Sequence, residues 1–176
     1  MAETVGLAAA TISGHDLQWS FSPVSGAGAA KTGGRFNRKG EPTLYLALGI
    51  MTAVNECTQG LSLRLQPLTM CEYDVDCEPV ADCRTEAARN VLGMKHDDLA
   101  CSWMDFLRAG KDAPSWLAVD RLKADGYVGM LAPSFAPGAT ADNCNLILWR
   151  WGPDLPSRVS VYDPSGRVPK DQLSWS

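Results

Sequence analysis

The sequence predicts an α+β fold: a single domain, residues 1–176, with a mostly antiparallel split sheet system and flanking helices. Three observations lead to this class. The 176 residues are 45% hydrophobic and 20% charged, which is enough apolar material for one core. No repeat, low-complexity tract or linker divides the chain. Helix-like segments in the middle of the chain are followed by strand-like segments that come one after another.

The first third of the chain is expected to contain more loop than regular structure. Residues 1–42 are rich in Gly, Ala, Ser and Pro, and only the stretch "LQWSFS" indicates a short strand there. The stretch "TLYLAL", residues 43–48, predicts a short buried strand. In residues 49–60, "GIMTAVNECTQG", Ile50, Ala53, Val54 and Cys57 fall at i, i+3, i+4 and i+7 and predict a helix of about three turns.

The remainder of the chain predicts a half-buried strand, a group of helices and then further strands. In residues 69–80, "TMCEYDVDCEPV", apolar and acidic residues alternate, so Glu72, Asp74 and Asp76 are expected on an outer face. Helices are predicted in residues 85–93, 97–110 and 112–126, the last ending at Gly126. Strands are predicted in residues 127–134, 145–151 and 158–163.

Charge and cysteine content exclude several classes of function. The net charge of −4 argues against a general affinity for nucleic acid or anionic membranes, since both require a large positive field. Without a charged-then-apolar leader or an apolar run of about 20 residues, we expect a cytoplasmic protein. The six cysteines form no CxxC motif and are accompanied by only two histidines, so we expect buried, reduced thiols and no metal site.

The loop "KTGGRFNRKGEPTLYLA", residues 31–47, gathers basic side chains and glycines just before a buried strand. Gly33 and Gly34 allow the backbone to approach a ligand closely, and the planar fork of Arg35 matches two phosphate oxygens at a time. The loop therefore indicates either a surface turn or a diphosphate site. The other basic side chains are expected to be solvated or to raise the local potential: Lys31, Arg38 and Lys39.

Five further side chains could serve a ligand or only the fold. Tyr45 points to the opposite side of its strand from its leucine neighbours, where its ring either packs in the core or stacks on a cationic ring. Glu56 borders the apolar stripe of its helix and is either solvated or catalytic. Ser134 lies at the end of a predicted strand, where it is either an ordinary turn serine or a ligand-binding group. Asn143 and Asn145 open the next strand, and either serves a ligand or satisfies turn backbone.

The order and spacing of these residues resemble a known family. "GGRFNRKGEPTLYLA", a glutamate eleven residues after Tyr45, "DGYVGMLAPS" and "NLILW" are similar to the RES domain, named for its arginine, glutamate and serine. The resemblance covers a core of about residues 12–150. It implies a fold similar to the diphtheria-toxin type of ADP-ribosyltransferase, a bacterial toxin of a toxin–antitoxin pair, and NAD as the substrate, without a metal.

The resemblance also implies the residues of the site. Arg35, Tyr45 and Glu56 are the expected catalytic residues. The residues expected to bind NAD are Gly34, Arg35, Tyr45, Ser134 and Asn145. Cleavage of the nicotinamide–ribose bond builds positive charge on the ribose, which a fixed Glu56 carboxylate would stabilise. Arg35 would hold the diphosphate, Tyr45 would stack on nicotinamide, and Ser134 would hydrogen-bond nicotinamide or its ribose.

One departure from the family bears on the acceptor of ADP-ribose. Many RES proteins carry another arginine in the first strand, but here no arginine precedes Arg35, and Ser13 or His15 falls near that place. This weakens the case for phosphate as acceptor, so we expect transfer to a protein, with NAD hydrolysis or phosphorolysis as the alternative. A non-enzymatic module that binds an acidic partner or RNA is a third hypothesis, which the net charge disfavours for RNA.

A toxin made without a secretion signal must be held inactive in its own cell. The resemblance implies a cognate antitoxin, usually with a helix-turn-helix DNA-binding part, which covers the NAD site. The acidic strand face of Glu72, Asp74 and Asp76 either helps to dock a basic partner or is simply solvated. No direct contact with nucleic acid or membrane is expected.

Overall fold

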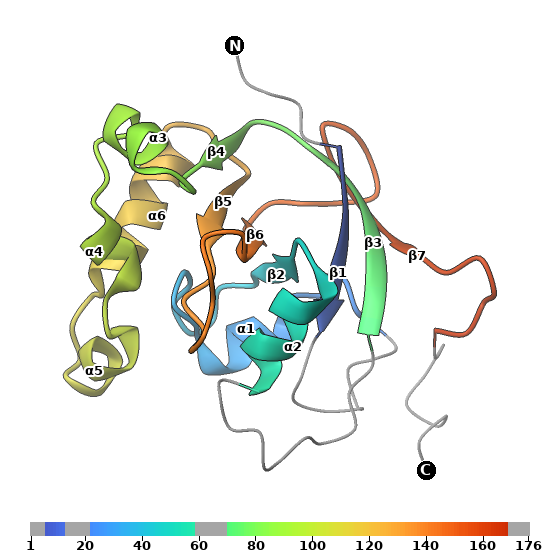
Figure 1. The fold of residues 1–176 in the computed structure, drawn as a ribbon, viewed down its shortest axis with the longest axis horizontal. Coiled ribbons are helices and arrows are strands. Elements are labelled where there is room, and N and C mark those ends of the chain that lie inside the picture. Colours follow the sequence, from blue (N-terminus) through green and yellow to red (C-terminus); the bar gives the residue numbers. More distant parts are fainter. Residues whose placement is uncertain (1–5, 13–21, 59–69, 169–176) are drawn as a thin grey trace.

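The computed structural model of the chain describes residues 6–12, 22–58 and 70–168 (Figure 1). The strands within these residues are β1 Gly6–Ile12, β2 Leu44–Ala47, β3 Met70–Cys77, β4 Val80–Asp82, β5 Gly129–Pro133, β6 Cys144–Leu148 and β7 Ser157–Tyr162. The helices are α1 Ala27–Thr32, α2 Ile50–Thr58, α3 Glu86–Val91, α4 His96–Ala100, α5 Trp103–Arg108 and α6 Pro114–Ala124. No helix in these ranges is both long and apolar enough to span a membrane.

The strands form one sheet in the order β4-β5-β6-β2-β1-β3-β7. All neighbouring pairs are antiparallel except β4 and β5, which are parallel. The centre of the sheet is narrow, because β1 meets β2 only at the pair Ala10 and Ala47, whereas β1 and β3 pair along the whole of β1. The sheet therefore consists of two halves, β4-β5-β6-β2 and β1-β3-β7, and the predicted α+β class with a mostly antiparallel split sheet is confirmed.

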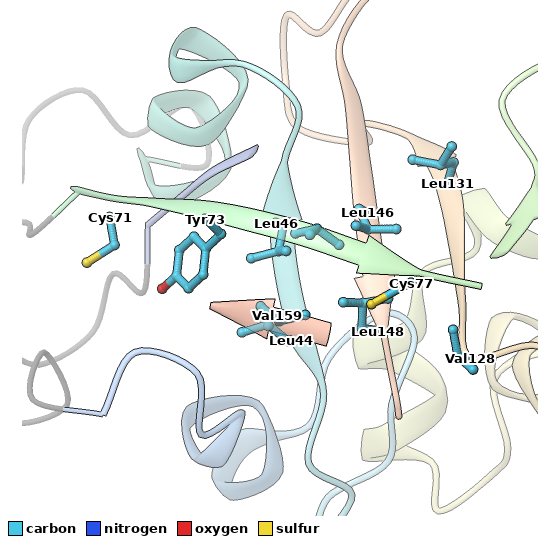
Figure 2. Packing of buried hydrophobic residues seen from close by; sticks show 11 residues of the cluster. Leu44, Leu46, Cys71, Tyr73, Cys77, Val128, Leu131, Leu146, Leu148 and Val159 are labelled. Atoms are coloured by element: carbon cyan, nitrogen blue, oxygen red, sulfur yellow. The ribbon is translucent and has the colours of Figure 1, made fainter. Parts of the chain in front are cut away.

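The first hydrophobic core joins the two halves of the sheet. Figure 2 shows β3 crossing β2 and β6, with the leucines of β2 and β6 and Tyr73 of β3 in one cluster. Leu46 and Leu148 are fully buried in this cluster, and so is Tyr73, whose hydroxyl donates a hydrogen bond to Pro23 O at 3.2 Å. Complete burial of a leucine stabilises a fold by roughly 1.5–3 kcal/mol, so this cluster is a main reason why the halves fold onto each other.

The second core lies on the opposite face of β2, β5 and β6. Ile147 of β6 and Met130 of β5 pack there against Leu99 of α4 and Leu122 of α6, all nearly or fully buried. Helices α3 to α6 lie together beside β4 and β5 (Figure 1). Tyr45 belongs to this face, as its position in the strand predicts, and it packs against the second core while its leucine neighbours enter the first.

Most predicted elements after residue 42 are present, and β3 has the expected alternation. Its apolar side chains after Met70 are buried, whereas Met70 itself, Glu72 and Asp74 are exposed. Asp76 is half-buried, and its Oδ2 pairs with Arg158 Nη2 of β7 at 3.2 Å. Of the six cysteines expected to be buried, Cys57 and Cys101 are only half-buried. The other four are buried: Cys71, Cys77, Cys83 and Cys144. Burial raises the pKa of the Cys77 thiol to about 11 and that of the Cys83 thiol to about 12.

Four features of the secondary structure differ from what the sequence predicts. Residues 1–42 contain a central strand, β1, and a helix, α1, although their small residues carry no strong pattern. Residues 97–110 form two short helices separated at Cys101 and Ser102, and β4 was not expected at all. Ile50 is 61% exposed, so the buried stripe of α2 does not begin at its first residue. The strand expected in "LQWSFS" falls almost entirely outside the described residues.

Candidate functional site

Glu56 lies on α2, which packs on β1 and β2, and its carboxylate reaches the ends of β5 and β6. Ser134, just after β5, donates a hydrogen bond from Oγ to Glu56 Oε1 at 2.7 Å. Asn145 of β6 donates from Nδ2 to the same oxygen. The other oxygen, Oε2, accepts no hydrogen bond from any residue that the structure describes. Two neutral donors therefore orient the carboxylate and leave one oxygen for a ligand.

Arg35 is held by main-chain carbonyls rather than by a carboxylate. Its Nη1 donates to Leu99 O at 3.2 Å and to Cys101 O at 2.6 Å. These carbonyls end α4, where helix carbonyls lack partners within the helix, so the break between α4 and α5 creates the acceptor pair. Within the described ranges, Arg35 Nε and Nη2 donate to no acceptor. One edge of the guanidinium fork thus remains for an anion.

Electrostatic coupling places Arg35, Tyr45 and Glu56 in one site. Burial lowers the pKa of the Arg35 guanidinium, and attraction to Cys101, Glu56 and Tyr45 opposes this change. Burial raises the pKa of the Tyr45 hydroxyl, which the nearby positive charge of Arg35 partly counteracts. Arginine remains protonated in any such environment. The site therefore contains the positive charge of Arg35 and the carboxylate of Glu56. The neutral phenol of Tyr45 lies between β2 and the loop that contains Gly33, Gly34 and Arg35, which we call the glycine loop.

The Tyr45 hydroxyl fixes the shape of the glycine loop. It donates to Asn37 Oδ1 at 2.8 Å and accepts from Phe36 N at 3.0 Å. Asn37 is 1% exposed, and its Nδ2 donates to the carbonyls of Ala29, Arg38 and Glu41 at 3.0–3.1 Å. Asn37 therefore holds the two ends of the loop close to its centre by hydrogen bonds. Tyr45, through its hydrogen bond with Asn37, connects this group of residues to β2.

Position 34 requires glycine because two side chains lie close to the place that a Cβ atom would occupy. A Cβ atom there would lie 2.7 Å from Tyr45 Oη and 2.7 Å from Asn37 Oδ1, closer than real Cβ contacts. Trp116 Nε1 of α6 donates to Gly34 O at 2.9 Å, and Ser115 Oγ donates to Arg35 O. The main chain on both sides of Arg35 is therefore fastened to α6.

Arg38 was expected to be solvated or to raise the local potential, but the structure pairs it with carboxylates. Its guanidinium contacts Asp120 of α6, with Nη2–Oδ2 at 2.9 Å, and Asp112, with Nε–Oδ1 also at 2.9 Å. These hydrogen bonds are the main reason why the pKa of Arg38 is raised. Arg38 thus anchors the loop to α6, while Lys31 and Lys39 are exposed as predicted.

The structure brings together all six residues proposed for the site, although their contacts with NAD remain a prediction. Asn143 serves the turn instead, because its Oδ1 accepts from Thr140 N at 2.7 Å and its Nδ2 donates to Thr52 Oγ1. Sequence reasoning missed Asn37, Ser115 and Phe135. Asn37 could have been found, because it lies inside the loop motif that carries the family resemblance. Phe135 is adjacent to Ser134 but was not considered. Among the described residues no group of three or more metal-ligating side chains is present.

Comparisons with known proteins agree with this arrangement. A search of curated proteins gives no match. A solved structure with the same fold is the crystal structure of the M. tuberculosis MbcT–MbcA toxin–antitoxin complex, at 21% sequence identity and a TM-score of 0.59. The match covers 91% of this chain and 83% of that one. The family model of the RES domain matches residues 8–171, a range that includes the glycine loop, α2, β5 and β6. Because the match extends over nearly the whole chain and every element of the site, the chain belongs to the RES domain family.

Proposed function

We propose that the chain binds NAD at this site, cleaves the nicotinamide–ribose bond and transfers ADP-ribose to a protein acceptor, as the toxin of a toxin–antitoxin pair. The observation that carries the proposal is the orientation of the Glu56 carboxylate by Ser134 and Asn145 within electrostatic reach of Arg35. Family membership supports the same substrate. The fold shared with a chain of a toxin–antitoxin complex supports the biological role.

The chemistry requires a negative charge beside the ribose. When the glycosidic bond breaks, its electron pair leaves with the nicotinamide, which becomes neutral, and positive charge develops on the ribose ring. Glu56 Oε2 has no partner among the described residues and supplies that negative charge, while the donors on Oε1 prevent the carboxylate from rotating away. Preorganised charge of this kind accelerates a reaction because it costs no reorganisation in the transition state.

The roles of the other residues follow from their contacts. The Nε and Nη2 edge of Arg35 would bind the diphosphate. Ser134 already gives its hydroxyl hydrogen to Glu56 and accepts from Ala136 N at 3.2 Å, so with Asn145 it acts first as a positioning residue. The Tyr45 hydroxyl is hydrogen-bonded to the loop, so the role that we propose for Tyr45 is stacking of its ring on nicotinamide.

NAD hydrolysis and phosphorolysis are the alternatives, and the pairing of Arg38 disfavours the second. Phosphorolysis requires an anion to be held beside the developing cation. The basic residue nearest to Arg35 along the loop that is not exposed, Arg38, is occupied by Asp112 and Asp120. An acceptor that brings no additional negative charge, such as a protein side chain or water, therefore fits better.

The test is the release of nicotinamide from NAD by the purified chain, with and without cell extract and with and without phosphate. We expect release that increases in the presence of extract. Glu56→Gln keeps an oxygen acceptor for Ser134 and Asn145 but lacks the charge, so it should bind NAD normally and lose about a hundredfold or more in rate. Arg35→Ala should instead weaken NAD binding. Absence of release under every condition, or small equal effects of both substitutions, would contradict the proposal.

The partner we propose is an antitoxin that covers the site, with a helix-turn-helix DNA-binding part. Expression of the chain alone in bacteria should arrest growth, whereas Glu56→Gln should not. Co-expression of the neighbouring gene should relieve the arrest and yield a stable complex. Harmless expression of the intact, folded wild-type chain would argue against the toxin role and leave the enzymatic proposal to its own assay.

A further inference from the structure

Phe135 connects the site to an exposed aromatic residue that the proposed function does not use. The Cζ atom of Arg35 lies 4.8 Å from the centroid of the Phe135 ring. The rings of His96 and Phe36 lie 5.7 Å and 6.1 Å from it, both in tilted geometry. Phe36 is 4% exposed and belongs to the second core, whereas Phe135 is half-buried and His96 is exposed. An aromatic surface thus extends from the core, past the guanidinium, to solvent.

The position of this surface relative to Glu56 is set by two adjacent residues. The Ser134 side chain reaches Glu56 on α2, and the next side chain, Phe135, reaches Arg35 and His96 of α4 instead. The two adjacent side chains thus contact different groups. His96 is linked to Arg35 through Phe135, whereas Ser134 contacts Glu56.

The connectivity of the dinucleotide makes this position meaningful. In NAD the diphosphate separates the nicotinamide riboside from the adenosine. If the nicotinamide ribose lies at Glu56 and the diphosphate at Arg35, the adenosine is attached at the other end of the diphosphate and lies next to the groups around Arg35. An exposed imidazole beside a half-buried phenyl ring offers a purine a π-face for stacking, and the ring nitrogens of His96 can hydrogen-bond its edge.

We propose that His96 and Phe135 form the binding site for the adenine base of the dinucleotide substrate. The inference rests on the proposed function and specifies which half of the substrate each part of the site recognises. Stacking on one aromatic side chain typically changes affinity by a factor of roughly 5 to 150. The adenine site should therefore affect the affinity for NAD and not the cleavage step at the other end of the molecule.

The experiment compares NAD with nicotinamide mononucleotide, which has the same scissile bond and no adenylate. His96→Ala is the informative variant because His96 is exposed and contacts Phe135 rather than Arg35. We expect its KM for NAD to rise about tenfold or more, within the range for one stacked base, with kcat within about twofold of wild type. Its kcat/KM for the mononucleotide should not change. His96→Phe, which keeps an aromatic face, should restore the KM for NAD.

A matched control is Val91→Ala, which truncates another exposed helical side chain, 87% exposed on α3, and should alter neither substrate. Phe135→Leu should raise the KM for NAD as well, and its thermal unfolding shows whether the fold is intact. An unchanged KM for NAD in His96→Ala, while the wild type binds and cleaves NAD, overturns this inference alone. Equal losses for both substrates also overturn it, since they indicate a general defect. A wild-type protein that neither binds nor cleaves NAD overturns the proposed function and this inference together.

Discussion

Replacement of Gly34 by alanine adds only one methyl group, but it should destabilise the fold and weaken NAD binding. The added Cβ would lie 2.7 Å from the Tyr45 hydroxyl oxygen and 2.7 Å from Asn37 Oδ1, and 3.3 Å from Tyr45 Cζ. Neither oxygen can simply move away, because the two are hydrogen-bonded to each other and Asn37 Nδ2 donates to three carbonyls. The loop that carries Arg35 must therefore shift, or the bond between Tyr45 and Asn37 must break.

The magnitude follows from these two ways of relieving the clash. Overpacking at a tight site costs about 1–3 kcal/mol, and loss of a buried hydrogen bond costs about 1–3 kcal/mol. Because either change relieves the clash, we expect Gly34→Ala to lower the free energy of unfolding by about 1–3 kcal/mol. A displaced Arg35 should also raise the KM for NAD. Chemical denaturation with an unchanged m-value, together with nicotinamide release, measures both effects.

Two companion variants separate the clash from a general effect of alanine. Gly28→Ala is the matched control, because its Cβ would meet nothing within 4 Å and it lies in α1, where alanine is favoured by up to about 1 kcal/mol. In Tyr45→Phe one of the two close oxygens is absent, so Gly34→Ala should cost less there than in the wild type. Equal costs in both backgrounds, or a Gly34→Ala protein as stable as Gly28→Ala, would refute the close approach described above.

Two further predictions concern Glu56 and Tyr45. Asn145→Asp removes the Nδ2 donor to Glu56 and places a second negative charge beside it, so nicotinamide release should slow by about a hundredfold or more; release at the wild-type rate would mean that residue 145 does not contact Glu56. Burial raises the pKa of Tyr45 in the folded state, so the unfolded chain loses that proton first and stability falls above about pH 10, by up to about 1.4 kcal/mol per pH unit for one tyrosine. Urea unfolding between pH 8 and 11 should therefore show a shallower fall for Tyr45→Phe than for the wild type, and parallel curves would contradict this.

The elements after residue 42 could be predicted because their patterns are local. The alternation in β3 and the apolar run of β2 each determine which side chains face a core, whatever the rest of the chain does. Strand β1 could not be predicted, because "GLAAATI" has small residues and no alternation. Its strand state is set by pairing with β3 along its whole length, a contact far away in sequence.

The sequence was sufficient to predict which residues form the site, but not which of them contact each other. Arg35, Glu56 and Ser134 stand out through their spacing in the family motif. That Asn145 and Ser134 donate to one oxygen of Glu56 depends on how α2 packs over the sheet, which no local pattern records. The acceptors of Arg35 depend on the end of α4, a helix that the sequence suggested would continue through Cys101.

The carbonyl anchorage of Arg35 has a consequence for how this site can vary. A guanidinium fixed by a carboxylate is neutralised and depends on one particular side chain. Arg35 instead donates hydrogen bonds to the main-chain carbonyls of Leu99 and Cys101, and no carboxylate within the described residues pairs with it. Its positive charge is therefore preserved for a ligand. Exchange of the side chain at position 101 would leave the carbonyl acceptors in place as long as the helix still ends there, and would remove only the hydrogen bond from Cys101 Sγ to Ser115 Oγ.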